Sequence, residues 1–256
     1  METNQKFTTP DGYASDIAVF TITSDQIGEY KPPLKSLKIM LIKRSEFDHE
    51  GNPNIEAGKW ALPGGFVRPE ETAFQAAERR LLEETGVGGL RIKHFGIYDS
   101  PKRDNRGWII SNAHYVIAKE TDLKSRKITY DAADIQLFPI KEALGLELAF
   151  DHRQIIDDAI WFIKKDMALT TLAKHFLPEE FVLSELQGVL LTVLDDASIA
   201  TDAAFFRKAP TLPFLEAVSE NGKPKKSNRY SKTPAQLYRF NEVQPIVSVY
   251  RNKLQG

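Results

Sequence analysis

The chain contains no cysteine among its 256 residues. This absence excludes disulfide bonds, thiolate nucleophiles and cysteine-ligated zinc sites from the whole chain, and it fits a reducing compartment. The sequence also lacks an apolar run of the roughly 18 residues that a membrane-spanning helix needs. Its first 16 residues do not have the basic-then-apolar order of a secretory signal. We therefore expect a cytoplasmic protein that does not enter a membrane.

The length and composition indicate a globular protein with two domains. Hydrophobic residues make up 42% of the chain and charged residues 27%, which is typical of chains that fold around a core. A chain of this length suits two domains of ordinary size. The periodicity changes near Phe150 from alternating strands and helices to a mainly helical pattern. We expect one domain over 1–150, a second over 151–256, and an α+β fold overall.

The first 150 residues predict a mixed sheet with a central helix. Runs rich in β-branched and apolar residues predict strands over 15–22, 37–44, 90–98, 108–118 and 135–140. Apolar residues at helical spacing predict a helix over 70–85. Acidic Glu70 and Glu71 suit the start of this helix, and Gly86 suits its end.

The second half predicts helices followed by a basic hairpin. Helical patterns cover 151–167 and 170–177, and a third helix starts at Ser184, which has capping-box spacing to Gln187. Residues 195–200 are predicted to form a turn, and 201–210 a short helix. Two strands, 214–218 and 235–240, flank a basic segment that is unfit for a core.

The charge is unevenly distributed along the chain. The net charge is −1, but residues 1–150 sum to −2, residues 151–202 to −6 and residues 203–256 to +7. A strongly basic end on a nearly neutral protein indicates a local anionic partner. An ordinary solvated basic tail is the alternative.

The stretch GGFVRPEETAFQAAERRLLEETGV, residues 64–87, carries a spaced pattern of glycines, glutamates and arginine. It resembles the Nudix box, G-x5-E-x7-R-E-U-x-E-E-x-G-U with U apolar, and it departs from that pattern only at Arg80, which replaces a glutamate. A surface helix rich in charge pairs would not explain the two glycines, Gly65 and Gly86. The resemblance implies an α/β/α sandwich around a mixed sheet.

The resemblance also implies roles for individual residues. In the Nudix family the glutamates bind Mg²⁺ or Mn²⁺, which neutralises a diphosphate and activates water. Glu71, Glu83 and Glu84 are then the expected metal ligands, with Glu83 and Glu84 the catalytic pair if the chain is an enzyme. Gly64, Gly65 and Arg79 are expected to contact the ligand.

Arg80 is the residue that puts hydrolysis in doubt. Arginine does not lose its proton and does not ligate Mg²⁺. Its i,i+4 spacing from Glu84 predicts an ion pair that competes with the metal. We therefore expect weak metal binding and weak or absent hydrolysis. Two alternatives are that Glu71, Glu83, Glu84 and an acid in 131–134 still hold the metal, or that Arg80 points into solvent.

A second signature follows the box. In DSPKRDNRGWIISNAHY, residues 99–115, Arg103 and Arg106 flank Asp104. Guanidinium groups suit phosphates and a carboxylate suits ribose hydroxyls, although a salt-linked loop would look the same. The segment resembles the RDPRG…S…Y segment of ADP-ribose-type Nudix proteins and of Nudix-related transcriptional regulators, with Asn105 in place of the proline.

The regulator family joins a Nudix domain to a C-terminal winged helix. Further segments of this chain resemble that architecture: LAFDHRQIIDDA, LPEEFVLSELQ, FFRK and PAQLYRF. The resemblance implies a homodimer that binds double-stranded operator DNA and senses ADP-ribose or a related nucleotide or sugar. The alternative is an active Nudix hydrolase of ADP-ribose-like substrates with an accessory winged helix.

The basic end of the chain fits a DNA-binding winged helix. Helix-turn-helix proteins place their second helix in the major groove and use cations to contact phosphates. The expected DNA-binding residues are Arg207, Lys208, Lys223, Lys225, Lys226 and Arg229. A winged helix that docks a protein is the alternative. We expect at least one of Phe205 and Phe206 to lie in the core.

Overall fold

The computed structural model describes residues 8–47, 51–128 and 132–241, and the chain forms two compact units. The first comprises Met1–Phe20, Ile39–Ile117 and Thr121–Ala159, and the second comprises Thr21–Lys38, Ala118–Glu120 and Ile160–Gly256. Within the described residues, no helix is both long and apolar enough to cross a membrane.

A mixed sheet forms the centre of the first unit. In the described part of the chain the sheet has seven strands: the order is β3-β2-β1-β6-β5, with β4 paired to β1 and β7 to β2. β1 runs parallel to β6, whereas β5 runs antiparallel to it. The strands are β1 Gly12–Asp25, β2 Leu34–Arg44, β3 Trp60–Ala61, β4 Gly64–Phe66, β5 Ile92–Tyr98, β6 Ile109–Ile117 and β7 Ala132–Pro139. The predicted α+β class with a mixed sheet is confirmed.

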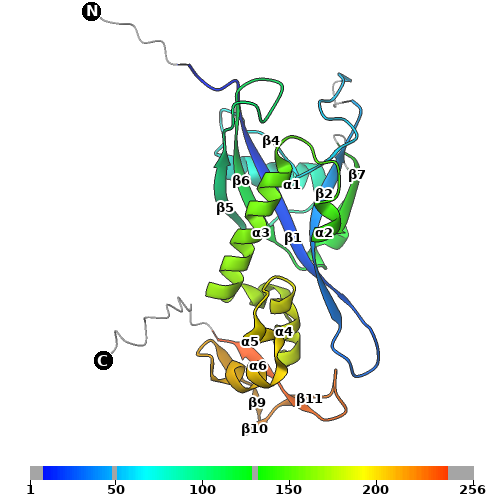
Figure 1. Cartoon of the computed structure of the whole chain (residues 1–256), viewed down its shortest axis with the longest axis vertical. Helices are drawn as coiled ribbons and strands as arrows, with labels where there is room; N and C mark the ends of the chain where they lie inside the picture. The colour runs from blue at the N-terminus through cyan, green and yellow to red at the C-terminus, as the bar shows by residue number, and fades with distance from the viewer. Residues whose placement is uncertain (1–7, 48–50, 129–131, 242–256) are drawn as a thin grey trace, which may run out of the picture. The chain divides into compact units, whose positions relative to one another are not determined.

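The sheet is covered on both faces. Residues 14–20 of β1 are all buried, and because successive side chains of a strand point to opposite faces, both faces must be packed. The helix α1 (Ala73–Thr85) and the beginning of α3 (His152–Leu169) lie on opposite sides of the sheet (Figure 1). The short α2 (Ile140–Ala143) follows β7.

The helix α1 starts three residues later than predicted. Its N-cap is Thr72, whose hydroxyl accepts the Gln75 N–H at 3.2 Å while the Gln75 side chain accepts the Thr72 N–H at 2.9 Å. This reciprocal pair satisfies two backbone donors at the helix end. Glu71 therefore precedes the helix, where its carboxylate accepts the Arg68 N–H. Gly86 ends the helix with φ 70°, as predicted.

We expect Thr72→Ala to lower the free energy of unfolding by about 1 kcal/mol, because one N–H of the first turn loses its acceptor. Urea unfolding followed by circular dichroism measures the change. Thr72→Ser is the control, since it keeps the hydroxyl and should retain most of the stability. An alanine variant as stable as the wild type would show that this cap contributes nothing.

The second unit is built mainly of short helices. They comprise the rest of α3, η2 (Leu172–Phe176), α4 (Leu183–Leu191), α5 (Ala197–Ala200), α6 (Asp202–Lys208) and η3 (Ala209–Thr211). The prediction that 195–200 is a turn is wrong, because α5 lies there with its N-cap at Asp196. The predicted Ser184–Gln187 cap is also wrong: Glu185 accepts the Val182 N–H, and the helix begins at Leu183.

Two strands and a hairpin segment follow the helices. β8 (Leu215–Ala217) pairs antiparallel with β13 (Tyr238–Phe240), which confirms the predicted strands over 214–218 and 235–240. Between them, β9 (Ser219–Glu220) pairs with β10 (Lys223–Pro224), and β11 (Lys226–Ser227) pairs with β12 (Ala235–Gln236). Helices followed by a basic hairpin are the predicted winged-helix order. Phe205 is buried, as expected, whereas Phe206 is exposed.

Candidate functional site

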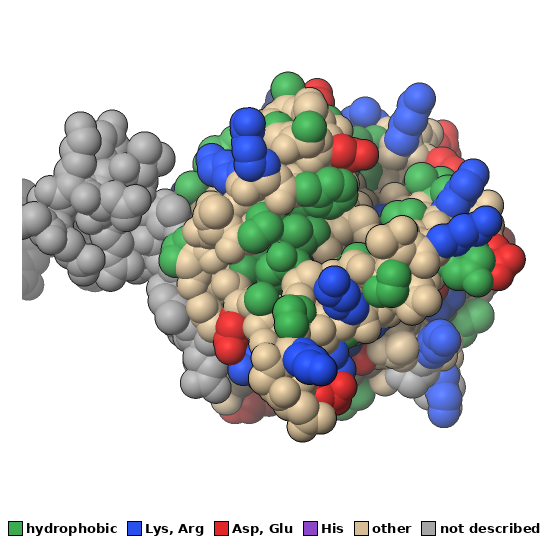
Figure 2. Space-filling model, turned by 90° about the horizontal axis from the view of Figure 1, so that it is seen from below, with side chains coloured by type: hydrophobic (Ala, Val, Ile, Leu, Met, Phe, Trp, Pro, Cys, Tyr) green, Lys and Arg blue, Asp and Glu red, His purple; other side chains and the backbone are tan. Residues whose placement is uncertain are grey.

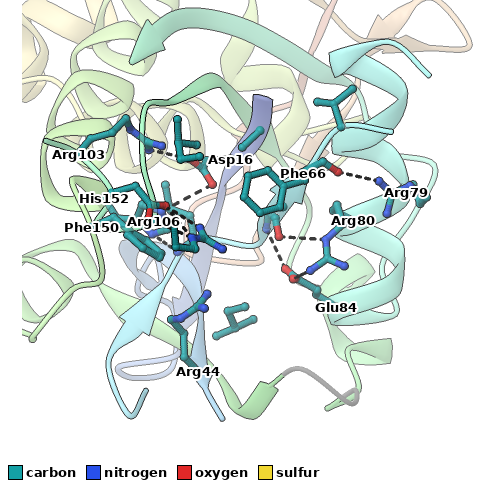
Figure 3. A pocket seen from close by; sticks show the side chains of 18 of the residues that line it. Asp16, Arg44, Phe66, Arg79, Arg80, Glu84, Arg103, Arg106, Phe150 and His152 are labelled. Carbon is teal, nitrogen blue, oxygen red and sulfur yellow. Dashed lines mark hydrogen bonds and ion pairs between the residues drawn. The ribbon is translucent and has the colours of Figure 1, made fainter. Parts of the chain in front are cut away.

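A pocket of about 530 Å³ opens in the first unit. It is bordered by β1, β4, α1 and the loop after β5, together with the start of α3 (Figure 3). Six arginines and three carboxylates are among the described residues that line it, so its charged groups sum to +3. These residues are Arg44, Arg68, Arg79, Arg80, Arg103, Arg106, Asp16, Glu84 and Asp104.

Most of the site residues predicted from the sequence lie together in this pocket. Those that line it are Gly64, Gly65, Arg79, Glu84, Arg103, Asp104 and Arg106. Glu71 and Glu83 are not among the lining residues, but both contact Arg79. Sequence reasoning missed Asp16, Arg44, Phe66, Phe150 and His152. An acid at the start of an apolar strand was the one available signal for Asp16.

Arg80 is held against the glycine turn. Its Nη2 donates to Glu84, and its Nε donates to the Gly64 carbonyl at 3.0 Å. The other Glu84 oxygen accepts the Gly64 N–H at 2.8 Å. The predicted ion pair is therefore confirmed, and the alternative that Arg80 points into solvent is wrong, because its side chain is only 20% exposed and lines the pocket.

A second arginine engages the other box glutamates. Arg79 Nε donates to Glu71 at 2.9 Å, and its Nη1 donates to Glu83 at 2.8 Å. The hydrogen bond from Arg79 lowers the pKa of Glu71 to about 2. Glu71 therefore stays ionised at any physiological pH, and its carboxylate is directed toward Arg79.

A buried charge network lies beside the pocket. Arg103, with 3% of its side chain exposed, donates to Asp151 at 2.9 and 2.7 Å and to Asp16 at 3.3 Å. The Ser111 hydroxyl also donates to Asp16, at 2.7 Å. These bonds tie β1, β6 and the segment leading into α3 to one guanidinium. Arg103 was predicted to bind a phosphate, but in this arrangement its nitrogens serve carboxylates.

His152 adds a neutral group to this network. Its Nδ1 accepts the Leu62 N–H at 2.9 Å, and its Nε2 lies 3.6 Å from Asp16 Oδ1. Burial lowers the pKa of His152, so the imidazole is uncharged at neutral pH. Because Nδ1 is an acceptor, the proton resides on Nε2, which faces Asp16.

Arg106 lies close to two aromatic rings that line the pocket. Its guanidinium is 4.8 Å from the Phe66 ring centroid and 5.4 Å from that of Phe150. It also forms a two-pronged bond with Asp104, with Nη2–Oδ2 at 2.6 Å and Nε–Oδ1 at 3.0 Å. Flat cationic and aromatic surfaces of this kind suit a ligand with a planar ring and phosphate oxygens.

The cations predicted to bind DNA fall into two groups. Lys225 pairs with Glu180 at 2.8 Å and Arg229 with Glu185 at 3.3 Å, so both anchor the hairpin segment within the second unit. Arg207, Lys208, Lys223 and Lys226 are exposed. Figure 2 shows a face on which Lys and Arg side chains lie around an apolar patch.

A family comparison explains the glycine turn and its helix. Residues 18–159 match the model of the NUDIX domain. The chain belongs to the Nudix family. The match includes the box at residues 65–87, and the sheet and helices described above are those of the Nudix fold.

Three relatives extend the comparison. Over 88% of this chain and 80% of its own length, the "ADPR responsive transcriptional repressor NtrR" of Acinetobacter baylyi is 27% identical. The crystal structure of Shewanella oneidensis NrtR complexed with a 27mer DNA matches 90% of this chain and 93% of its own, with 25% identity and a TM-score of 0.65. A mutT/nudix family protein from Listeria innocua is 48% identical over 64% of this chain and all of its own, with a TM-score of 0.55.

The Nudix box of this chain does not fit a divalent metal as it is folded. Glu84 is bonded to Arg80 and to the Gly64 N–H, Glu71 to Arg79, and Glu83 to both arginines. Among the described residues, no three His, Cys, Asp or Glu side chains gather as metal ligands. In the predicted segment 131–134, Asp131 lies outside the described residues, while Asp134 bonds to the Ile135 N–H and to Gln136.

Proposed function

We propose that the chain is a ligand-responsive transcription regulator. Its Nudix domain, assigned to 1–150, binds ADP-ribose or a related nucleotide or sugar. Its second domain, assigned to 151–256, is a winged helix that binds double-stranded operator DNA as part of a cytoplasmic homodimer. The observation that carries the proposal is the combination of a Nudix pocket rich in arginine with exposed cations on a helix and hairpin.

The relatives support both halves of this proposal. The Acinetobacter relative is described as a repressor that responds to ADP-ribose, and the Shewanella structure contains DNA. Each covers most of this chain. We assign ligand contacts to Gly64, Gly65, Arg79, Asp104 and Arg106, with Arg103 adding its charge from beside the pocket while it bonds Asp16 and Asp151. We assign DNA contacts to Arg207, Lys208, Lys223 and Lys226, with smaller contributions from Lys225 and Arg229, which are paired with glutamates. For ligand control, ADP-ribose must bind the DNA-bound and free arrangements with different affinity.

A mobility-shift experiment tests the proposed function. The full chain is titrated onto a duplex from the region upstream of its own gene at about 0.1 M salt, where non-specific binding is already weakened. We expect a shifted band that a scrambled duplex does not compete away, and ADP-ribose should change the midpoint of the titration. No specific binding, with and without ADP-ribose, would refute the regulator.

Hydrolysis is the second candidate function, because every other fixed position of the Nudix box is present. We expect Arg80 to weaken the binding of Mg²⁺ or Mn²⁺ to Glu71, Glu83 and Glu84. Hydrolysis should therefore be weak or absent. Incubation of the wild type with ADP-ribose and either metal, followed by chromatography of the nucleotides, measures this. Clear turnover that is lost on Glu84→Gln would favour the hydrolase.

A further inference from the structure

We propose that the Nudix pocket binds a diphosphate-linked nucleotide without any divalent cation, and that the guanidinium of Arg80 supplies the positive charge which a metal supplies in an active hydrolase. This inference rests on the proposed function and specifies how the ligand site works. It follows from three features of the pocket: the seating of Arg80, the excess of cations, and the engagement of the box carboxylates.

The side chain of Arg80 packs directly against the glycine turn formed by Gly64 and Gly65. A Cβ atom added to Gly65 would lie 2.5 Å from Arg80 Nε and 3.0 Å from its Cζ. No φ in the left-handed region demands glycine at this position, and with arginine at position 80 the missing side chain leaves room for the guanidinium. Together with the bonds to Gly64 and Glu84, this contact fixes the guanidinium in one place at the edge of the pocket. A fixed donor group loses little conformational entropy when it meets a ligand.

The pocket carries more positive charge than its own carboxylates neutralise. Asp16, Asp104 and Glu84 are each paired with an arginine. Arg44, in contrast, is bonded to the Ile55 carbonyl and the Asn54 amide oxygen, which are uncharged. Burial, and then repulsion from Arg106, lower the pKa of Arg44. An anion that enters the pocket reduces the electrostatic repulsion between these guanidinium groups. The diphosphate of such a nucleotide carries two negative charges.

A divalent metal and the arginines compete for the same carboxylate oxygens of the Nudix box. Mg²⁺ needs oxygen ligands close to octahedral geometry, and here those oxygens accept hydrogen bonds from Arg79, Arg80 and the Gly64 N–H. Releasing them would leave a permanent cation unpaired beside a divalent one, because arginine does not deprotonate. The pocket therefore favours direct contact between guanidinium groups and phosphate oxygens, whose geometry matches.

Calorimetric titration of the full chain with ADP-ribose tests the proposal, once in EDTA and once in MgCl₂. The wild type should bind with dissociation constants that differ by less than about threefold between the two solutions. Arg80→Glu removes the charge and restores a carboxylate. Its affinity in EDTA should fall by about tenfold or more, as expected when a hydrogen bond to a charged group is lost. MgCl₂ should recover much of that loss.

Two further variants separate charge from metal. Arg80→Gln loses the charge without gaining a metal ligand, so its affinity should be low in both solutions. Arg91→Glu makes the same charge change as Arg80→Glu at an exposed position that does not line the pocket, and it should bind like the wild type. Thermal unfolding of each variant checks that it is folded.

The outcomes distinguish this inference from the proposed function. Wild-type binding that appears only with MgCl₂ would overturn the inference and leave the regulator intact. No binding of ADP-ribose in either solution would overturn the inference and exclude ADP-ribose as the ligand, whereas the regulator itself is refuted only by the absence of specific DNA binding in the mobility-shift experiment. Undiminished binding by Arg80→Gln in EDTA would remove Arg80 from the role assigned to it. The wild-type comparison needs no variant, so a poorly folded mutant does not prevent the test.

Discussion

Replacing Arg103 by methionine should lower the free energy of unfolding by about 3–5 kcal/mol, the loss typical of removing one partner from a buried ion pair. Methionine keeps the aliphatic volume but leaves Asp16, which is buried, and Asp151 without their shared cation. Each carboxylate would then bear the cost of its own desolvation. Urea unfolding followed by tryptophan fluorescence and circular dichroism measures the change.

Lys102→Met is the matched control for Arg103→Met. It also replaces a cationic side chain by methionine, one residue earlier in the same loop, where the side chain is exposed. Surface substitutions of this kind usually alter stability by less than about 0.5 kcal/mol. Equal losses from the two variants would show that the network around Asp16 contributes nothing special. An Arg103→Met protein as stable as the wild type would show that the folded chain does not need this ion-pair network.

Removing two exposed cations from the hairpin should weaken DNA binding in a salt-dependent way. Lys223 and Lys226 are exposed, and we expect each to contact one phosphate. In Lys223→Ala/Lys226→Ala, the slope of log K against log salt should fall in magnitude by about 2, since each phosphate contact contributes about 0.9. Fluorescence anisotropy with any duplex over a series of KCl concentrations measures the slope, because non-specific binding reports the same electrostatic contacts.

Lys225→Ala is the control within the same hairpin. Lys225 is held by Glu180, which raises its pKa through a side-chain hydrogen bond, so part of its charge is already compensated. Its removal should change the slope by less than the removal of Lys223 or Lys226 alone. An unchanged slope in the double variant would exclude this hairpin from the DNA interface. A larger effect from Lys225→Ala would show that Lys225, although it is paired with Glu180, contacts DNA more strongly than the exposed Lys223 and Lys226.

The sequence predicted elements better than it predicted their ends. The strands and α1 follow from local periodicity, and Gly86 follows from the left-handed conformation that a helix C-cap requires. The predicted start of α1 rested on the acids at 70–71, whereas the helix is capped by the Thr72–Gln75 pair. In α4, Glu185 competes with Gln187 for the same role and bonds the Val182 N–H. Sequence spacing alone does not show which of two possible capping residues forms the cap.

Two of the pocket residues that escaped prediction, Asp16 and His152, come from segments far from the box in the sequence. β1 and β6 pair in parallel with Asp16 opposite Ala113, and this register brings Asp16 within reach of Ser111. His152 also contacts Asp16, although the two residues lie near opposite ends of the first unit's sequence. No periodicity encodes which strand lies beside which, so the box was readable as one continuous segment while Asp16 and His152 were not.

Because Gly65 and Arg80 are in contact, the effect of a substitution at one of these positions should depend on the residue at the other. With arginine at 80, a side chain at 65 meets the guanidinium, whereas with a shorter residue at 80 the same change is less constrained. The two positions should therefore be epistatic, and a double-mutant cycle on Gly65→Ala and Arg80→Ala should show a coupling in the range of 0.5–3 kcal/mol found for residues in contact. While arginine occupies position 80, position 65 is therefore expected to remain glycine.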